Sequence, residues 1–410
     1  MSNATQSFQQ RTLSNGLTIV AEIVPDAHSA AAGFFVRTGA RDEDAMVMGV
    51  SHFLEHMMFK GTEDLSADDI NRGFDEIGAR NNAYTSHELT CFYAQVLPTD
   101  LGTALDLLGR MMRPALRQSD FDTEKGVILE EIAMYKDNPF WVLYEETDQR
   151  HFGSHPLGYR VLGTEDTIKA LTRDQMQQYF DDRYSGDNTT VALAGRLDFD
   201  ACCDQIEALC GHWQTTRPTR DAARPAISGE RFTMTDEGLS RAYALVLADA
   251  PSLDDDRRYA ASLLAQILGG GGNSRLHWAL IEEGIAEEAQ AAYDPHDGTG
   301  EFMVYASGDP QRLGEIEKIL AREIDGLGDS LEPADIERLQ AKYATSVTIG
   351  GERPNDRMQR LGRLWTYLGE HIPLEVELER INAVTLDDLR DTLDAFPIKP
   401  RTIGILSPGG

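Results

Sequence analysis

The sequence contains one short string whose residue types and spacing can do chemistry: His52-Phe53-Leu54-Glu55-His56. On an α-helix, the two histidines are four residues apart, which places them about 40° apart around the axis and one turn along it. Both imidazoles can therefore reach one metal ion. Glu55 lies on the same face beside the second histidine, so the string is the inverse of the common H-E-x-x-H zinc motif. The pattern predicts a zinc site.

Glu55 is expected to serve the chemistry rather than the metal. Bound zinc lowers the pKa of a water molecule towards about 7. A carboxylate beside that water can take its proton and pass it to a leaving amine. The competing interpretation is a solvated helix face on which His52, Glu55 and His56 pair only with one another.

A catalytic zinc site needs a third protein ligand, and the segment 119–137 contains candidates. The segment is expected to be a helix with one apolar and one acidic side. Glu124 and Glu131 are seven residues apart, so they lie on one face, about 10 Å apart along the axis. Glu130 points about 100° away from Glu131. An ordinary solvated face remains the alternative for these carboxylates.

The elements expected around the string occur twice along the chain in the same order. Each half begins with an apolar strand, continues with a helix, a second strand and a second helix, and ends with a closing strand. In the first half these elements are residues 32–36, 49–59, 91–97, 98–112 and 188–197. In the second half they are residues 243–247, 257–268, 301–307, 310–327 and 401–407. The second-half helix has no counterpart of the histidines.

This repetition predicts an α+β protein of two homologous α/β sandwich domains, each a mixed or antiparallel sheet packed with helices. A length of 410 residues suits two domains of about 200 residues each. The expected boundaries are a metal-binding domain at 1–216, a linker at 217–230 and a metal-free homologous domain at 231–410. The linker is rich in Pro, Arg and Ala and has no apolar periodicity.

Composition excludes several classes of function. A net charge of -30 argues against nucleic-acid binding, since phosphate backbones are repelled. This charge is explained either by solubility or by an acidic chamber that attracts basic peptides. There is no 18-residue apolar span and no signal-like start, so neither a membrane span nor secretion is expected. Four cysteines without a C-x-x-C spacing fit a reduced, cytoplasmic setting.

Four stretches together resemble the insulinase-like, or pitrilysin-type, metallopeptidases, also called inverzincins. They are VRTGARDE at 36–43, GVSHFLEHMMFKGT at 49–62, NAYTSHELTCFYA at 82–94 and EKGVILEEIAM at 124–134. The resemblance covers most of the chain. It is strongest to the short two-domain group that includes mitochondrial processing peptidase and its bacterial relatives.

The resemblance implies a role for each carboxylate and a place for the substrate. It implies that Glu131, not Glu130, is the third zinc ligand, and that Glu124 orients a ligand or the water as a further catalytic residue. It also implies that an extended peptide adds to an edge strand beside the zinc. The strand contacts are then Asn82, Ala83 and Tyr84.

The family further implies a clamshell dimer, of identical or unlike chains, that encloses unfolded peptides. Relatives that act alone commonly carry an Arg and a Tyr that hold substrate, shortly after a glycine stretch. Here residues 282–288 contain no Arg, although Tyr293 is a possible substrate contact. The expected function is a zinc endopeptidase for peptides. The alternatives are a peptidase that is active only with an unlike partner and a non-catalytic subunit such as those in respiratory complexes.

Overall fold

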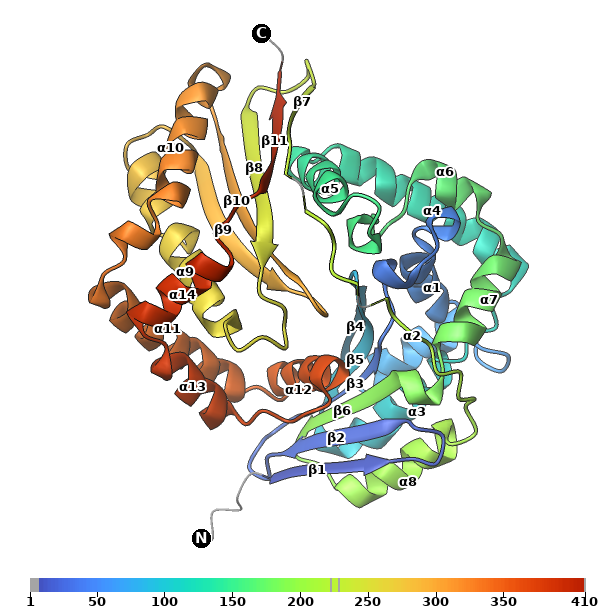
Figure 1. The fold of residues 1–410 in the computed structure, drawn as a ribbon. Helices are drawn as coiled ribbons and strands as arrows, with labels where there is room; N and C mark the ends of the chain where they lie inside the picture. The colour runs from blue at the N-terminus through green and yellow to red at the C-terminus, as the bar shows by residue number, and fades with distance from the viewer. Residues whose placement is uncertain (1–6, 222, 228, 409–410) are drawn as a thin grey trace. The chain divides into compact units, whose positions relative to one another are not determined.

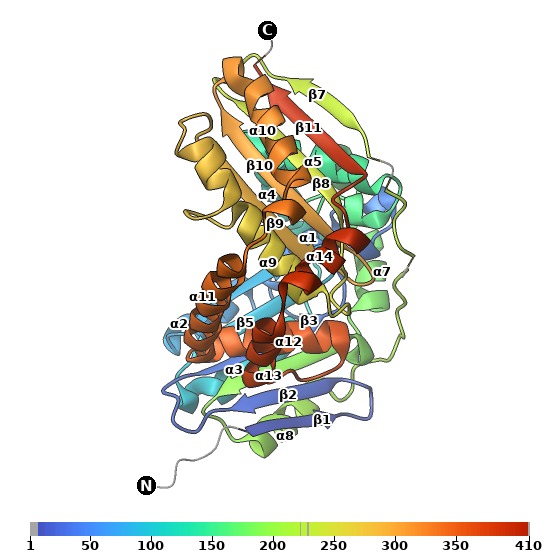
Figure 2. The same cartoon turned by 60° about the vertical axis from the view of Figure 1, so that its left-hand side comes forward.

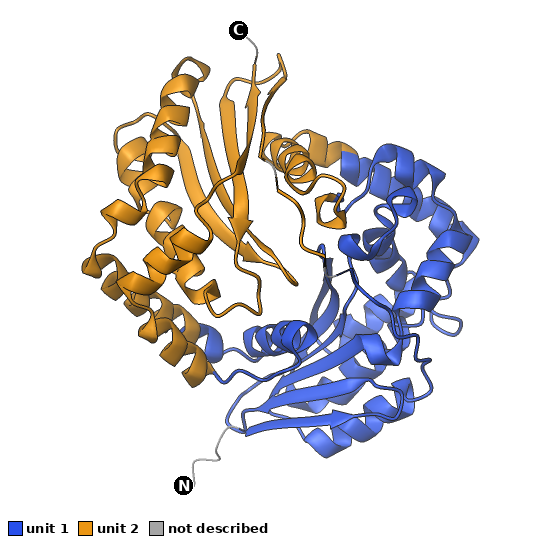
Figure 3. Ribbon diagram, in the orientation of Figure 1, with its two compact units in different colours: residues 1–132, 159–221, 348–373 blue, residues 133–158, 222–347, 374–410 orange. Residues whose placement is uncertain are grey.

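The computed structural model describes residues 7–221, 223–227 and 229–408. The chain divides into two compact units, shown in two colours in Figure 3. Unit 1 comprises residues 1–132, 159–221 and 348–373, and unit 2 comprises residues 133–158, 222–347 and 374–410. Each unit therefore includes a segment from the opposite half of the chain.

The core of unit 1 is a six-stranded mixed sheet in the order β1-β2-β6-β3-β5-β4. Its strands are β1 (Ser7–Thr12), β2 (Thr18–Ile23), β6 (Thr189–Gly195), β3 (Ala30–Val36), β5 (Thr90–Val96) and β4 (Arg80–Thr85). Only β2 and β6 pair in parallel; the other neighbours are antiparallel. Every residue of β3 and β6 is buried, which is expected of central strands covered on both faces.

Helices cover both faces of this sheet. One face packs against α12 (Pro354–Leu368), which comes from the second half of the chain, and the other packs against α3 (Leu101–Met111) and α8 (Phe199–Cys210). At Gly362 of α12 an added Cβ would overlap the Phe35 ring of β3, so the close approach requires glycine. The remaining helices of unit 1 are α1 (Val50–Met58), α2 (Ala67–Glu76), α6 (Glu165–Ala170) and α7 (Arg173–Arg183), with most of α4 (Gln118–Lys136).

Unit 2 has a five-stranded sheet in the order β7-β11-β8-β10-β9 (Figure 2). Its strands are β7 (Arg231–Thr235), β11 (Arg401–Ser407), β8 (Ala242–Ala250), β10 (Gly300–Gly308) and β9 (Glu288–Pro295). Again one pair, β7 with β11, is parallel and the others are antiparallel. This is the order and pairing of β2-β6-β3-β5-β4 in unit 1, so the predicted repetition of one plan is confirmed.

One face of the second sheet packs against α5 (Pro139–Phe152), which comes from the first half of the chain. The other face packs against α9 (Arg258–Gly269) and α10 (Leu313–Asp325) (Figure 1). Unit 2 also contains α13 (Leu374–Ala383), α14 (Leu386–Ala395) and most of α11 (Pro333–Gly351). Among the helices of the described residues, none is both long enough and apolar enough to cross a bilayer.

Candidate metal centre

The local sequence places and orients α1, the helix that carries the His-x-x-Glu-His string. The chain enters the helix through Gly49, whose φ of 92° is the left-handed conformation that glycine adopts without strain. The buried Glu43 carboxylate accepts hydrogen bonds from the backbone N–H groups of Gly49 and Ser51, both at 2.7 Å. These contacts satisfy donors that a helix N-terminus otherwise leaves open. Burial raises the pKa of Glu43 to about 8, and the amide hydrogen bonds partly offset this effect.

Three side chains from α1 and α4 converge on one point. Glu131 Oε2 lies 3.7 Å from His52 Nε2 and 3.6 Å from His56 Nε2. One ligand atom from each of the three residues lies within 4.8 Å of the others. These separations are too long for hydrogen bonds, but they match the spacing of about 3.4 Å between two ligands of a tetrahedral zinc with bonds of about 2.1 Å. The donor set of two imidazoles and one carboxylate therefore fits zinc.

The environment of the two histidines suits metal binding. Burial, together with the charge of His56, lowers the pKa of His52 to about 3, so this imidazole is neutral at pH 7. A neutral ring has the free lone pair that a metal requires. His56 Nδ1 lies 2.9 Å from Glu124 Oε1, a contact that leaves Nε2 directed towards Glu131. The other Glu124 oxygen pairs with Lys60 Nζ at 2.5 Å.

Glu55 lies on α1 beside these residues but is not part of the three-residue cluster. It is largely buried, and its Oε2 accepts a hydrogen bond of 2.7 Å from the Thr85 hydroxyl at the end of β4. Burial raises the pKa of Glu55, while the hydrogen bond from Thr85 lowers it. A carboxylate with a raised pKa, held by one hydrogen bond, is suited to accepting and releasing a proton.

The predicted α4 forms, and it separates the three candidate carboxylates. Glu131 faces the histidines, Glu124 is buried against His56, and Glu130 is exposed. Sequence reasoning missed two contacts of this site, Lys60 with Glu124 and Thr85 with Glu55. Both residues lie within the stretches that carry the family resemblance, which is the one signal in the sequence that points to them.

The predicted substrate strand is β4, the edge strand of the first sheet beyond β5. Asn82, Ala83 and Tyr84 lie on it, and β4 contacts α1. The Tyr84 hydroxyl donates to Gln359 Oε1 of α12 at 3.0 Å. Among the strands that the structure describes, β4 pairs only with β5. Its outer edge therefore presents backbone groups to which an extended peptide can pair.

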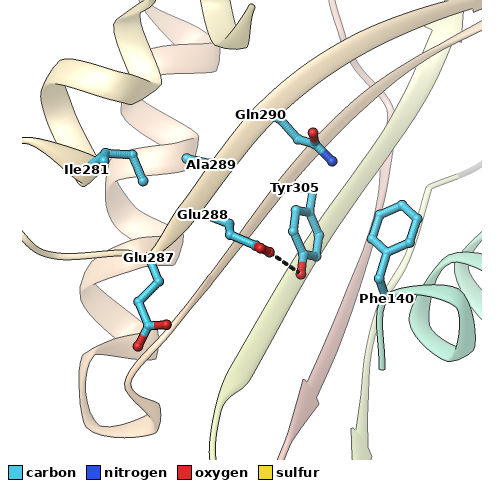
Figure 4. Close-up of a pocket in the computed structure, with 7 residues that line it drawn as sticks. All are labelled: Phe140, Ile281, Glu287, Glu288, Ala289, Gln290 and Tyr305. Atoms are coloured by element: carbon cyan, nitrogen blue, oxygen red, sulfur yellow. Dashed lines mark hydrogen bonds between the residues drawn. The ribbon is translucent and has the colours of Figure 1, made fainter. Parts of the chain in front are cut away.

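Tyr293 lies in unit 2, on β9, and its hydroxyl donates to the Pro251 carbonyl at 2.8 Å. The preceding stretch, residues 282–288, has no Arg of its own, but Glu287 pairs with Arg241 from the turn before β8. Part of this stretch borders a pocket of about 400 Å³ (Figure 4), in which Tyr305 donates to Glu288 at 3.2 Å. The pocket is lined by Phe140, Ile281, Glu287, Glu288, Ala289, Gln290 and Tyr305.

Comparison with known proteins agrees with the fold and shows the family. The family model of the insulinase peptidases, peptidase family M16, matches residues 18–165, and that of the peptidase M16 inactive domain matches residues 170–343. The chain belongs to this family. An uncharacterised zinc protease of Streptomyces coelicolor is 34% identical over 397 residues, which cover 94% of this chain and 86% of that protein.

One further relative and one solved structure extend the comparison. An uncharacterised zinc protease of Bacillus subtilis is 30% identical over 406 residues, covering 98% of this chain and 99% of that protein. The crystal structure of a protease from Helicobacter pylori has a TM-score of 0.91 at 18% identity, covering 98% of this chain and 100% of that one. At that identity the likeness concerns the fold alone.

Proposed function

We propose that this protein is a zinc-dependent endopeptidase that hydrolyses unfolded peptides. The observation that carries the proposal is the convergence of His52, His56 and Glu131 at 3.6 and 3.7 Å, distances suited to a shared ion. Family membership and the names of the relatives support the same conclusion. When bound, zinc supplies a Lewis acid that polarises a peptide carbonyl and lowers the pKa of a water molecule.

Residues of the chain would then transfer the proton, orient a ligand and compensate a buried charge. Glu55 takes a proton from the attacking water and delivers it to the leaving amine, a role supported by its burial beside the histidines. Glu124 fixes the orientation of His56 through the 2.9 Å contact with Nδ1. Lys60 compensates the buried charge of Glu124.

The outer edge of β4 would hold the substrate in an extended conformation. Asn82, Ala83 and Tyr84 are the contacts we propose, since β4 is an edge strand that contacts α1. Binding through backbone hydrogen bonds is tolerant of sequence and requires an extended chain. This requirement favours unfolded peptides over folded proteins.

The identity of the third ligand is the sharpest test of this proposal. Glu131→Gln should lose the zinc held by His52 and His56 and, with it, peptide hydrolysis, because a neutral amide is a poor zinc ligand. Glu130→Gln is the matched control, since it makes the same change at the adjacent, exposed position and should keep both. Zinc is measured by elemental analysis and hydrolysis with an unstructured peptide. Loss of zinc in Glu130→Gln with retention in Glu131→Gln would move the ligand by one residue.

We also propose that the protein acts as a dimer, and that an unlike partner chain supplies residues that bind the substrate. The motivation is the acidic stretch 282–288, in which Glu287 is already paired with Arg241. The purified chain alone should therefore hydrolyse peptides far below the usual range of about 1 to 10³ per second. Rates within that range for the homogeneous chain would rule out the need for an unlike partner. A reduced, cytoplasmic setting is part of this proposal, supported by four free, buried cysteines.

A further inference from the structure

We propose that unit 2 contains a second divalent-cation site, formed by Asp294, His296 and Glu301. One ligand atom from each of these residues lies within 4.8 Å of the others. The three residues lie at one end of the hairpin formed by β9 and β10, and they share no residue with the centre on α1 and α4. The site would be structural, joining this hairpin to α5.

The sheet register brings the two carboxylates together. Asp294 on β9 is directly opposite Glu301 on β10, so both side chains point to the same face. That face packs against α5, since Tyr305 of β10 and Leu247 of β8 cluster with Leu143 of α5. Carboxylates directly opposite each other repel and destabilise a sheet. A cation bound between Asp294 and Glu301 would attract both carboxylates and so offset their repulsion.

His296 completes the cluster. It follows Asp294 by two residues, and its backbone N–H donates to the Thr299 carbonyl at 2.9 Å, which closes the hairpin. His296 is 7% exposed and Glu301 is 2% exposed, whereas Asp294 is exposed. Two of the three proposed ligands are therefore buried, and the third reaches solvent, which gives an ion a path of entry.

The hydrogen bonding of Glu301 is a second, independent observation in favour of an ion. Its Oε1 accepts a hydrogen bond of 3.1 Å from the Tyr144 hydroxyl of α5. Its Oε2 is buried and has no hydrogen-bond partner among residues 7–221, 223–227 and 229–408. The buried hydroxyl of Thr299, in the adjacent turn, has none among them either. A buried carboxylate oxygen without a partner is costly, so the position is suited to an ion.

Asp249 is a second carboxylate of the same sheet, and its counter-charge can be compared with that of Glu301. It lies opposite Glu301 on the other side, on β8, and therefore on the same face. Asp249 pairs with Arg224 at 2.7 Å, so the chain itself supplies its counter-charge. Among the described residues, no Lys or Arg pairs with Glu301. The favourable electrostatic neighbour of Glu301 is His296, itself a proposed ligand. A cation bound by the cluster would give Glu301 the counter-charge that Arg224 gives Asp249.

The donor types indicate the class of ion. An imidazole combined with carboxylates suits a first-row ion such as Zn²⁺ or Mn²⁺ better than Ca²⁺ or Mg²⁺, which prefer oxygen alone. Asp148 of α5 is buried and interacts electrostatically with Glu301, His296 and Asp294. An ion at the hairpin would thus attract Asp148 and secure α5 to β9 and β10.

The test separates this site from the centre in unit 1. The full chain with His52→Ala and His56→Ala is stripped with EDTA and titrated with Zn²⁺ alone, and bound zinc and Tm are measured. We expect this variant to bind about one equivalent of zinc, with a rise in Tm of several degrees. Adding Glu301→Gln or His296→Ala should abolish both the zinc and the Tm response. Asp249→Asn, the matched control on the same face, should retain both.

Two further measurements test the proposal if the combined variants fold poorly. In the otherwise unchanged chain, Glu301→Gln should reduce bound zinc from about two equivalents to about one. In EDTA, Glu301→Gln should unfold at no lower temperature than the parent, because it removes a buried charge. The proposal is overturned if the His52/His56 variant takes up no zinc. It is also overturned if Glu301→Gln retains all the zinc, or if it lowers Tm in EDTA, since the cluster would then be held by protons and ion pairs.

Discussion

Glu55→Gln is expected to lower kcat for peptide hydrolysis by about 10²- to 10⁴-fold while zinc stays bound. Glutamine keeps the size and shape of the side chain and removes its ability to accept a proton. Its amide can still accept the hydrogen bond that Thr85 donates to Glu55 at 2.7 Å, so α1 should keep its position against β4. The zinc should remain because His52, His56 and Glu131 are unchanged.

The informative measurement is a pair, zinc content and kcat on one preparation, made with the partner chain present if activity requires it. Glu130→Gln is a suitable control, since it removes an exposed carboxylate from α4 and should change neither quantity. Near-normal kcat with zinc retained would remove Glu55 from the mechanism. Loss of zinc from Glu55→Gln would instead place Glu55 among the ligands, and Glu124 would be the next candidate for the base.

His52→Ala and His56→Ala should each abolish zinc binding in unit 1, because either change leaves only two protein ligands. The expected loss is about one equivalent of zinc per chain, accompanied by loss of peptide hydrolysis. Glu124→Gln should have a smaller effect, weakening zinc binding by about 10- to 100-fold, because the three ligands are unchanged. It removes the negative charge that contacts His56 Nδ1 at 2.9 Å and pairs with Lys60 at 2.5 Å.

Elemental analysis and competition with a chelator distinguish these two levels of effect. For the zinc of unit 1, the order expected is complete loss in the histidine variants, partial weakening in Glu124→Gln, and no change in Glu130→Gln. The zinc content of each variant is compared with that of its parent, so an ion bound in unit 2 does not affect the difference. If His52→Ala or His56→Ala retained the full zinc content of the parent, the assignment of the ligands would be wrong.

The overall plan was predictable because it depends on local patterns that occur twice. Apolar strands 32–36 and 243–247, together with the helices that follow them, appear in the structure as β3 with α1 and β8 with α9. The exchange of helices was not predictable. Nothing in the residues of α5 or α12 indicates that each packs on the sheet built mostly from the opposite half of the chain. Such packing depends on tertiary shape, for example on Gly362 against Phe35, rather than on periodicity.

The division between sequence and tertiary structure is the same at the sites. The sequence alone determines that His52, Glu55 and His56 share one helical face, because the 3.6-residue turn sets their spacing. Only the tertiary structure decides which carboxylate of α4 meets them, because packing against α1 sets the rotation of α4 about its axis. The contact of His56 with Glu124, for example, joins residues 68 positions apart in the sequence.

The cluster in unit 2 depends still more on tertiary structure. Asp294 and Glu301 face each other through strand register, and Tyr144 reaches Glu301 from 157 positions away in the sequence. No spacing rule connects a helix of the first half to a hairpin of the second. Contacts of this kind arise only when the chain has folded, which is why the sequence predicted the centre on α1 and not the cluster beside α5.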